Sequence, residues 1–340
     1  MTTIKDIAKA ADVSIATVSM VLNNSPRISK KTRDKVLETA KRLDYIPSFA
    51  AKTLKTNKSK TISVIVGDIV NPFFPELIKG VEASARSHGY SVMIYDMSVG
   101  EDAFYMELNK SISQQVDGLF ITGVAPVSDK TMEKLNSLCD GGMRIVSCNK
   151  HMKSDKFPII ISDDKEQIES LIYRLVANGH KNIGCISGKK DYWVTTQREG
   201  YFREILSEFG LYRENFVINA GFTFEDGNRG VRELLSKHPE ITAVMCIADT
   251  LGIGCSKEAQ KMGLSIPGDL SLFSVDGIEY MKFTSPQITT VNTHRYEYGF
   301  AGTERLIEMI ESNEPLETFN EDLHYPCSIM EGETISKPRS

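Results

Sequence analysis

A long alternation of short apolar runs and amphipathic stretches, from residue 62 to about residue 312, places the strongest constraint on the fold of this chain. The apolar runs are rich in β-branched residues, and most are separated by ten or more residues with helical periodicity. Continuous apolar strands that alternate with helices are typical of parallel sheets covered on both faces. The sequence therefore predicts an α/β fold for most of the chain.

The predicted units are too numerous for one sheet. The predicted strands cover residues 62–67, 90–95, 116–122, 144–149, 182–187, 243–248 and 270–275, and the helices between them include 73–88, 164–178, 196–209, 226–237 and 295–312. We expect two doubly wound parallel-sheet subdomains with a ligand cleft between them. The first would hold residues 61–160 and 292–322, and the second would hold residues 161–291 and 323–340.

The first 47 residues show a different pattern, which predicts three short helices. Ile4, Ile7, Ala8 and Ala11 have helical spacing, as do Val18, Val21 and Leu22, and then Val36, Leu37, Ala40 and Leu43. Ser14 and Ser29 stand where they can cap the second and third helices. The third helix should stop before Pro47, because a residue that precedes proline avoids the helical conformation.

A basic connector, residues 48–60, follows the predicted helices. It could form a short helix through Leu54, but a helix of that length needs a partner to be stable. Residues 1–60 carry 13 Lys and Arg against 5 Asp and Glu, whereas the whole chain has a net charge of −5. A basic head on an acidic body indicates that the head binds a polyanion and the body does not.

Other features of the sequence exclude several classes of protein. The six cysteines are scattered singly, which argues against a disulfide framework or a zinc site and favours reduced, buried thiols. No serine-hydrolase, zinc-protease or phosphate-loop motif is found, and the six histidines are dispersed, so we expect no enzyme, no metal and no cofactor. The chain lacks a signal-peptide pattern and a transmembrane run, which predicts a cytoplasmic protein.

A helix pair joined by a tight turn, with the second helix capped by Ser14, fits a helix-turn-helix. The chain also carries "TIKDIAKAADVSIATVSMVLN" (3–23), "SKKTRDKV" (29–36), "YIP" (45–47) and "AAKTL" (50–54), and then "NPFF" (71–74), "GHKNIGCISG" (179–188), "PGDLSLFSVDG" (267–277) and "PQITTV" (286–291). In this order the motifs resemble the lactose-repressor (LacI/GalR) family along nearly the whole chain. The resemblance implies a DNA-binding head, a hinge helix and a periplasmic-binding-protein-like body.

The resemblance also implies which residues of the head contact DNA. Ile15, Ala16 and Met20 match positions that meet base edges, and Arg27 matches one at the groove edge. Hydroxyl and amide side chains that match phosphate-positioning residues are Ser14, Thr17, Ser19, Asn23, Ser29 and Thr32. Within the hinge motif, Ala51 is a further DNA-binding residue and Leu54 matches the leucine that wedges into the minor groove.

Four positions depart from the family pattern. Asp12 stands where glycine is usual, Met20 where many members carry arginine, Ser48 where they carry asparagine, and Lys52 where arginine is common. With methionine at position 20, the predicted recognition helix contains no Lys, Arg or Gln. It cannot make the bidentate contact to guanine. We expect it to read thymine methyl groups and DNA shape.

The predicted effector residues follow the strands of the body, because ligands bind at the carboxyl ends of strands in such folds. They are Asp68, Phe74, Asn149, Tyr192, Trp193, Arg198, Phe222, Asp249 and Asp276, of which Arg198, Phe222 and Asp276 match effector contacts of the family. Phe73 could be core, Asp249 could instead cap a helix that begins at Thr250, and Arg198 and Asp276 could form an ion pair. Carboxylates, arginine and aromatic rings together suit a polyhydroxylated ligand.

The sequence thus predicts a homodimeric transcriptional regulator, a repressor, that binds a pseudo-palindromic operator under control of a sugar-like effector. The same residues could hold a nucleobase, and a protein partner could replace the small molecule. A free-standing small-molecule binding protein shares the body architecture, although the basic head argues against it. No leucine heptad follows residue 330, but a tetramer is not excluded.

Overall fold

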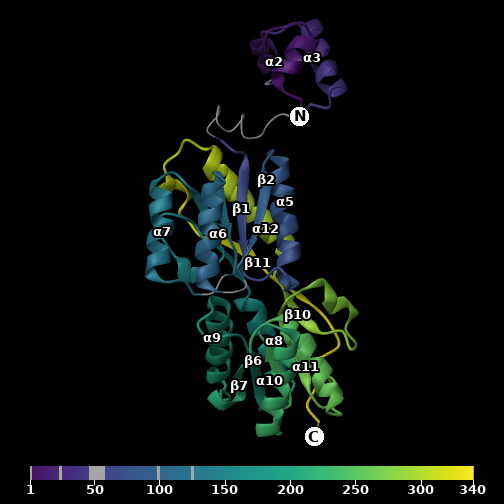
Figure 1. The fold of residues 1–340 in the computed structure, drawn as a ribbon. Coiled ribbons are helices and arrows are strands. Elements are labelled where there is room, and N and C mark those ends of the chain that lie inside the picture. The colour runs from purple at the N-terminus through teal and green to yellow at the C-terminus, as the bar shows by residue number, and fades with distance from the viewer. Residues whose placement is uncertain (1, 23–24, 46–57, 98–99, 124–125, 340) are drawn as a thin grey trace. The chain divides into compact units, whose positions relative to one another are not determined.

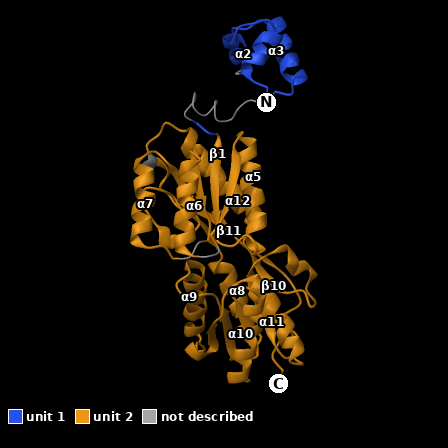
Figure 2. Cartoon of the chain, viewed as in Figure 1, with its two compact units in different colours: residues 1–59 blue, residues 60–340 orange. Residues whose placement is uncertain are grey.

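The protein consists of two compact units, residues 1–59 and residues 60–340 (Figure 2). The computed structural model describes residues 2–22, 25–45, 58–97, 100–123 and 126–339 (Figure 1). Most of the predicted hinge, residues 48–60, lies outside the described residues, as do Asn23, Ala51 and Leu54. The hinge helix therefore stays a prediction.

The head contains three α-helices in its described residues, as the apolar spacing predicts. They are α1 (Ile4–Ala10), α2 (Ile15–Leu22) and α3 (Lys30–Arg42). A small core of Ile7, Ala8, Ala11, Val18, Val21, Val36 and Ala40 lies between them. Leu37, which we expected on the buried face of α3, is 45% exposed, because one residue beyond Val36 the helix has turned by about 100°.

Local hydrogen bonds set the ends of these helices. The Ser14 hydroxyl accepts from the Thr17 backbone N–H at 3.0 Å, and Ser29 accepts from the Thr32 N–H at 3.3 Å, which confirms both predicted caps. Asp12 has a positive φ of 46° in the turn between α1 and α2. The turn therefore adopts the left-handed conformation that glycine would favour, with aspartate in its place.

The first subdomain of the body is built on a parallel four-stranded sheet with the order β2-β1-β3-β4. The strands are β1 (Thr61–Val66), β2 (Ser91–Asp96), β3 (Gly118–Ile121) and β4 (Arg144–Ser147), and the helices are α5 (Phe73–Ser87), α6 (Glu101–Ser113), α7 (Asp129–Asp140) and α12 (Arg295–Glu311). Two apolar clusters lie against this sheet, one with residues of α5 and α12 and one with residues of α6 and α7. Both faces of the sheet are therefore covered (Figure 1).

The second subdomain is built on a six-stranded sheet with the order β12-β10-β9-β8-β6-β7, parallel except for β12. Its strands are β6 (Ile183–Ser187), β7 (Val217–Asn219), β8 (Ala243–Cys246), β9 (Ser271–Asp276), β10 (Thr289–Asn292) and β12 (Ser328–Met330). Its α-helices are α8 (Lys165–Ala177), α9 (Trp193–Glu208), α10 (Phe224–Lys237) and α11 (Asp249–Lys261). Across the whole body, short 3₁₀ helices cover Lys150–Met152, Glu214–Phe216, Glu279–Phe283 and Leu316–Phe319.

A separate two-stranded parallel ladder joins β5 (Ile160–Asp163) to β11 (Leu323–Pro326) where the chain passes between the two sheets. The chain also returns to the first subdomain after β10 to form α12. The predicted doubly wound α/β body is confirmed, but β5, β7, β10, β11 and β12 were not among the predicted strands. Each has three or four residues, at least one of them polar, so none is itself a continuous apolar run.

Helices α5 and α12 pack with their backbones in close approach. A Cβ at Gly80 would lie 1.9 Å from the Tyr296 carbonyl oxygen, and one at Gly299 would lie 2.3 Å from the Leu77 carbonyl oxygen, so both positions require glycine. At the far end of α12, Glu311 forms an ion pair with Lys60, the first residue of the body. Lys60 also lies over the ring of Tyr90, at 4.2 Å, so the start of the body contacts both the end of α12 and the residue before β2.

Candidate functional site

The outward face of α2 is apolar and exposed. Ile15 and Met20 are 46% and 36% exposed, and Ala16 is exposed beside them, whereas Val18 and Val21 of the same helix are buried in the head core. The three residues predicted to meet base edges therefore share a solvent-exposed surface. No basic side chain of α2 lies on this surface, and Ile15, Ala16 and Met20 present apolar groups to solvent.

Several hydroxyls predicted to position phosphates already have partners within the head. Ser14 Oγ lies 2.8 Å from Thr17 Oγ1, and Ser29 Oγ lies 2.9 Å from Thr32 Oγ1. Each pair sits at the N-terminus of its helix, where the helix dipole favours an anion. Ser19 is half-buried on α2, and Arg27 is exposed in the loop before α3.

A cavity of about 300 Å³ lies between the two subdomains of the body, at the carboxyl ends of their strands. Eight of the nine predicted effector residues line it: Asp68, Phe74, Asn149, Tyr192, Trp193, Arg198, Phe222 and Asp276. Aromatic rings lie on both sides, since Phe73 and Phe74 pack edge to face at 5.2 Å and Tyr192 lies 5.5 Å from Phe222. Phe73 lines the cavity as well as Phe74.

Other lining residues were missed from the sequence. Asn71, Ser162, Asp164, Lys189, Gln197, Asp226 and Tyr298 also face the cavity. Ser162 and Asp164 lie at the end of β5, a strand that was not predicted, although the run "FPIII" (157–161) signalled an apolar, β-branched segment just before them. Recognition of that strand would have identified both residues.

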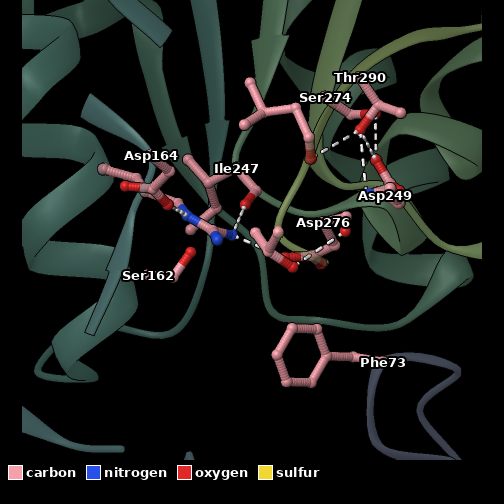
Figure 3. A network of polar contacts seen from close by, with 12 residues as sticks. Phe73, Ser162, Asp164, Ile247, Asp249, Ser274, Asp276 and Thr290 are labelled. Carbon is pink, nitrogen blue, oxygen red and sulfur yellow. Dashed lines mark hydrogen bonds and ion pairs between the residues drawn. The ribbon is translucent and has the colours of Figure 1, made fainter. Parts of the chain in front are cut away.

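A buried cation, the Arg198 guanidinium, lies on the second-subdomain side of the cavity. Figure 3 labels the residues that it contacts, Asp164, Ile247 and Asp276. The guanidinium Nε donates to Asp164 at 2.7 Å, and the Nη1 donates to Asp276 at 2.9 Å and to the Ile247 carbonyl at 2.6 Å. Burial alone would lower the pKa of Arg198, but the two carboxylates outweigh burial and raise that pKa above its usual range. The ion pair with Asp276 therefore exists, within a larger network than the sequence suggested.

Asp276 stands in a constrained turn at the end of β9. Its φ is 133°, and that of Gly277 is 73°, where a Cβ would lie 2.6 Å from the Asn292 Cα. The backbone carbonyl of Asp276 accepts a hydrogen bond from Arg295 Nη1. Arg295 Nη2 donates to Glu76 of α5 at 2.6 Å. Burial raises the pKa of Asp276, while Arg198 opposes the increase. The turn thus joins the second subdomain to α5 and α12.

Asp249 does not line the cavity, which corrects our expectation. Its buried carboxylate accepts from the Ser274 and Thr290 hydroxyls, both at 2.5 Å, and from the Ile278 backbone N–H at 2.7 Å (Figure 3). Neither does Asp249 cap a helix, because it is the first residue of α11 and its acceptors point to neighbouring strands. Burial, followed by the charge of Asp276, raises the pKa of Asp249 to about 6.

Trp193 brings the two subdomains into contact at the edge of the cavity. Its ring lies 5.4 Å from the His151 ring and 5.4 Å from the Lys150 Nζ, both from the first subdomain. Lys189 lies over Tyr192 at 5.9 Å and is exposed. The tryptophan therefore lines the cavity and contacts both subdomains.

Two family models match the chain. Residues 3–48 match the bacterial regulatory proteins of the lacI family, and residues 59–329 match the periplasmic binding proteins and sugar binding domain of the LacI family. The chain belongs to the LacI family. It is a DNA-binding transcriptional regulator with a helix-turn-helix head and an effector-binding body.

Curated relatives from this family are repressors. The chain is 33% identical over 298 residues to the HTH-type transcriptional repressor CytR of Escherichia coli K12, covering 87% of this chain and 86% of that one. It is also 33% identical over 336 residues to the ribose operon repressor of Halalkalibacterium halodurans, covering 98% and 97%. Both matches therefore span most of the length of these relatives.

Solved structures show the same fold. A Lac repressor dimer bound to operator and the anti-inducer ONPF matches with a TM-score of 0.86 at 22% identity, covering 98% of this chain and 99% of that one. A LacI family regulator from Enterococcus faecium with bound ribose matches with a TM-score of 0.70 at 22% identity, covering 82% and 100%. In the described part of this chain, the helices are too short or too polar to cross a membrane.

Proposed function

We propose that this LacI-family regulator represses transcription by binding a pseudo-palindromic operator as a homodimer, and that a small polyhydroxylated molecule in the cavity controls binding. The observation that carries the proposal is the cavity itself. It is bounded by both subdomains, so a ligand inside it favours one relative setting of the two over another. The names of two curated relatives, both repressors, support repression as the direction of the regulation.

The exposed face of α2 would enter the major groove in this proposal. Ile15, Ala16 and Met20 would contact thymine methyl groups, while Arg27 would reach the groove edge. The residues that would hold the phosphates are Ser14, Thr17, Ser19, Asn23, Ser29 and Thr32. Ala51 and Leu54 would contact the operator centre, as the family resemblance implies.

The cavity residues support a ligand with several hydroxyl groups. Asp276, Asn149 and Asp68 offer oxygen acceptors, and the rings of Phe74, Tyr192 and Phe222 offer flat apolar faces. A sugar or sugar derivative uses both features. A nucleobase or nucleoside is the second candidate, because the tilted pair of Tyr192 and Phe222 could also cover a planar base.

Selection of bound sequences from a random DNA pool tests the DNA-binding part of the proposal. The full chain should select inverted half-sites without an invariant guanine facing the start of α2, since no side chain of α2 can donate to guanine twice. Recovery of a single, unrepeated half-site would contradict the homodimer. A guanine fixed opposite α2 would contradict the apolar readout.

The hinge needs its own test. Leu54→Ala should weaken operator binding and leave the salt-dependent binding to random DNA almost unchanged, because a wedge acts only on the specific site. Titrations of both DNAs at two salt concentrations measure the difference. Equal losses on the two DNAs would show that Leu54 is not a wedge.

A further inference from the structure

The charge of the cavity restricts the ligand further than its shape does. Among the described lining residues, four are acidic, Asp68, Asp164, Asp226 and Asp276, and two are basic, Lys189 and Arg198. Lys189 is exposed at the edge. Inside the cavity, the cationic side chain that could neutralise a ligand is therefore Arg198.

The charge of Arg198 is already neutralised by protein groups. Two carboxylates, Asp164 and Asp276, contact its guanidinium directly, and its Nη1 is shared with the Ile247 carbonyl. One cation between two anions leaves a net negative charge beside the cavity. An anionic ligand would therefore meet repulsion there instead of a bidentate clamp.

One oxygen of this network is left without a partner. Asp164 Oδ2 accepts from Arg198, but Asp164 Oδ1 is buried and has no hydrogen-bond partner among the described residues. A buried carboxylate oxygen without a donor is unfavourable, and Asp164 itself lines the cavity. The missing donor can come from a ligand.

Arg198 Nη2 lies on the same guanidinium and makes no hydrogen bond within the described residues. Asp164 and Arg198 both line the cavity, so a ligand group that donates to Asp164 Oδ1 and accepts from Arg198 Nη2 would complete this network. A hydroxyl group satisfies both, because it donates one hydrogen and accepts another. A phosphate or carboxylate group carries only acceptors at neutral pH and cannot itself donate to Asp164. A phosphorylated sugar could still donate through a remaining hydroxyl, but its phosphate would add negative charge to a lining with four aspartates.

We propose that the effector is an uncharged polyhydroxylated molecule, a free sugar or a nucleoside, with one hydroxyl donating to Asp164 Oδ1, and that the cavity rejects the phosphorylated forms. This inference rests on the proposed function, since it concerns the ligand of the same cavity. Lys150 and Lys189 lie at the edge over aromatic rings. They are where a phosphorylated ligand would have to place its charge.

Calorimetric titration of the full chain with matched pairs tests the proposal. The pairs are ribose and ribose 5-phosphate, glucose and glucose 6-phosphate, and adenosine and adenosine 5′-monophosphate, followed by a panel of other neutral sugars and nucleosides. The neutral member should bind at least about tenfold more tightly than its phosphorylated partner. The sugar and nucleoside pairs distinguish the two sources of hydroxyl groups.

Asp164→Asn tests the contact, and Asp163→Asn is its matched control. The first variant keeps the shape but replaces an acceptor beside the cavity, so neutral binding should fall about tenfold and the preference over the phosphorylated partner should narrow. Asp163 is exposed and pairs with His324, so the same charge change there should alter neither value. If the asparagine variant does not fold, Asp164→Glu should weaken neutral binding and retain the preference.

A phosphorylated member that binds as tightly as its neutral partner would overturn the proposal, as would a panel with no neutral binder. If Asp164→Asn weakened binding of the neutral and the phosphorylated ligand equally, the role of Asp164 would be to position Arg198, and the proposed hydrogen bond from the ligand to Asp164 would be wrong. Operator selection by the same protein separates these outcomes from failure of the proposed function. If the protein selects half-sites but binds no neutral ligand, the proposal of an uncharged effector fails while the proposed DNA-binding function stands.

Discussion

The exposed face of α2 and the cavity of the body are built in opposite ways. On α2, the outward residues Ile15, Ala16 and Met20 carry no charge and touch solvent, while the core beneath them is made of small apolar side chains. In the cavity, Arg198 and Asp276 are buried charges, each held by groups from other strands and helices. The exposed side chains of α2 can adjust to a partner by small shifts, whereas the charged groups of the cavity are held in place by their hydrogen bonds.

The difference shows where each site gains selectivity. Apolar contact with a thymine methyl discriminates weakly, so the head depends on DNA shape and on repeated half-sites. Buried donors and acceptors discriminate strongly, because a ligand that leaves one unpaired forfeits a full hydrogen bond. Mutations should therefore have large effects in the cavity and small ones on α2.

Arg198→Ala should have the largest effect. Removal of the cation leaves Asp164 and Asp276 buried and unpaired, which should lower the free energy of unfolding of the body by about 3–5 kcal/mol and abolish the effector response. Denaturant titration of the full chain measures the loss. Arg203→Ala is the control on the same helix, because Arg203 is 58% exposed and its pair with Glu199 should contribute less than about 1 kcal/mol. Equal losses would contradict the fixed network.

Asp249→Asn should change the pH dependence of stability. Because the pKa of Asp249 is raised from 3.8 to about 6, the folded protein holds this proton more tightly than the unfolded chain does. Its ionisation therefore opposes folding above pH 6 by about 3 kcal/mol, and this effect disappears as the pH falls toward 4.

The asparagine variant has no carboxyl group to ionise, so it should lack this pH dependence. As the pH is lowered from 7.5 to 4.5, the free energy of unfolding of the wild type should rise by about 2–3 kcal/mol relative to that of the variant. Denaturant titrations at several pH values measure it. Parallel curves for the two proteins would show that burial does not raise this pKa.

Met20→Arg should convert the apolar readout into a charged one. A guanidinium at this exposed position should raise the affinity for half-sites that carry a facing guanine by about 1–3 kcal/mol. Selection from a random DNA pool compares the variant with wild type. Leu37→Arg, at an exposed position of α3, adds the same charge and should strengthen binding to all DNA without selecting guanine. Identical selected sites for wild type and Met20→Arg would refute the prediction.

Ser14→Ala should have the smallest effect. It removes the acceptor for the Thr17 N–H and should lower the stability of the head by about 1 kcal/mol. Hydrogen exchange of α2 amides in the full chain measures this loss, and amides of β1 and β9 provide the internal control. Faster exchange in the body as well would mean that the head and the body do not unfold separately.

The long apolar strands and amphipathic helices could be predicted from the sequence because each signals its own burial. Strand β1, for example, is buried at all six positions, as its apolar run indicates. Strand β5 could not be predicted in the same way, because it has four residues and two of them are polar. Because β5 was not predicted, Asp164, which directly follows it, was not predicted as a ligand residue either.

The positions of effector residues could be predicted more easily than their partners. Asp276 ends β9 and Arg198 lies on the helix entered after β6, so both were placed at the carboxyl edge of the sheet, and an ion pair between them was one alternative. The orientation of Asp249 depends instead on the hydroxyls of Ser274 and Thr290, which lie 25 and 41 residues away in the chain. Such contacts depend on the register of neighbouring strands, which no local pattern contains.

Helix α12 has a mechanical consequence. Its first residue, Arg295, contacts Asp276 and Glu76 beside the cavity, and its last residue, Glu311, is tied to Lys60, where the body begins. A helix of 17 residues is about 25 Å long, and its backbone-to-backbone packing on α5 resists bending. Such a rod acts as a lever, because a tilt of about 5° at the Arg295 end moves the Glu311 end by about 2 Å, comparable with the helix shifts of known switches.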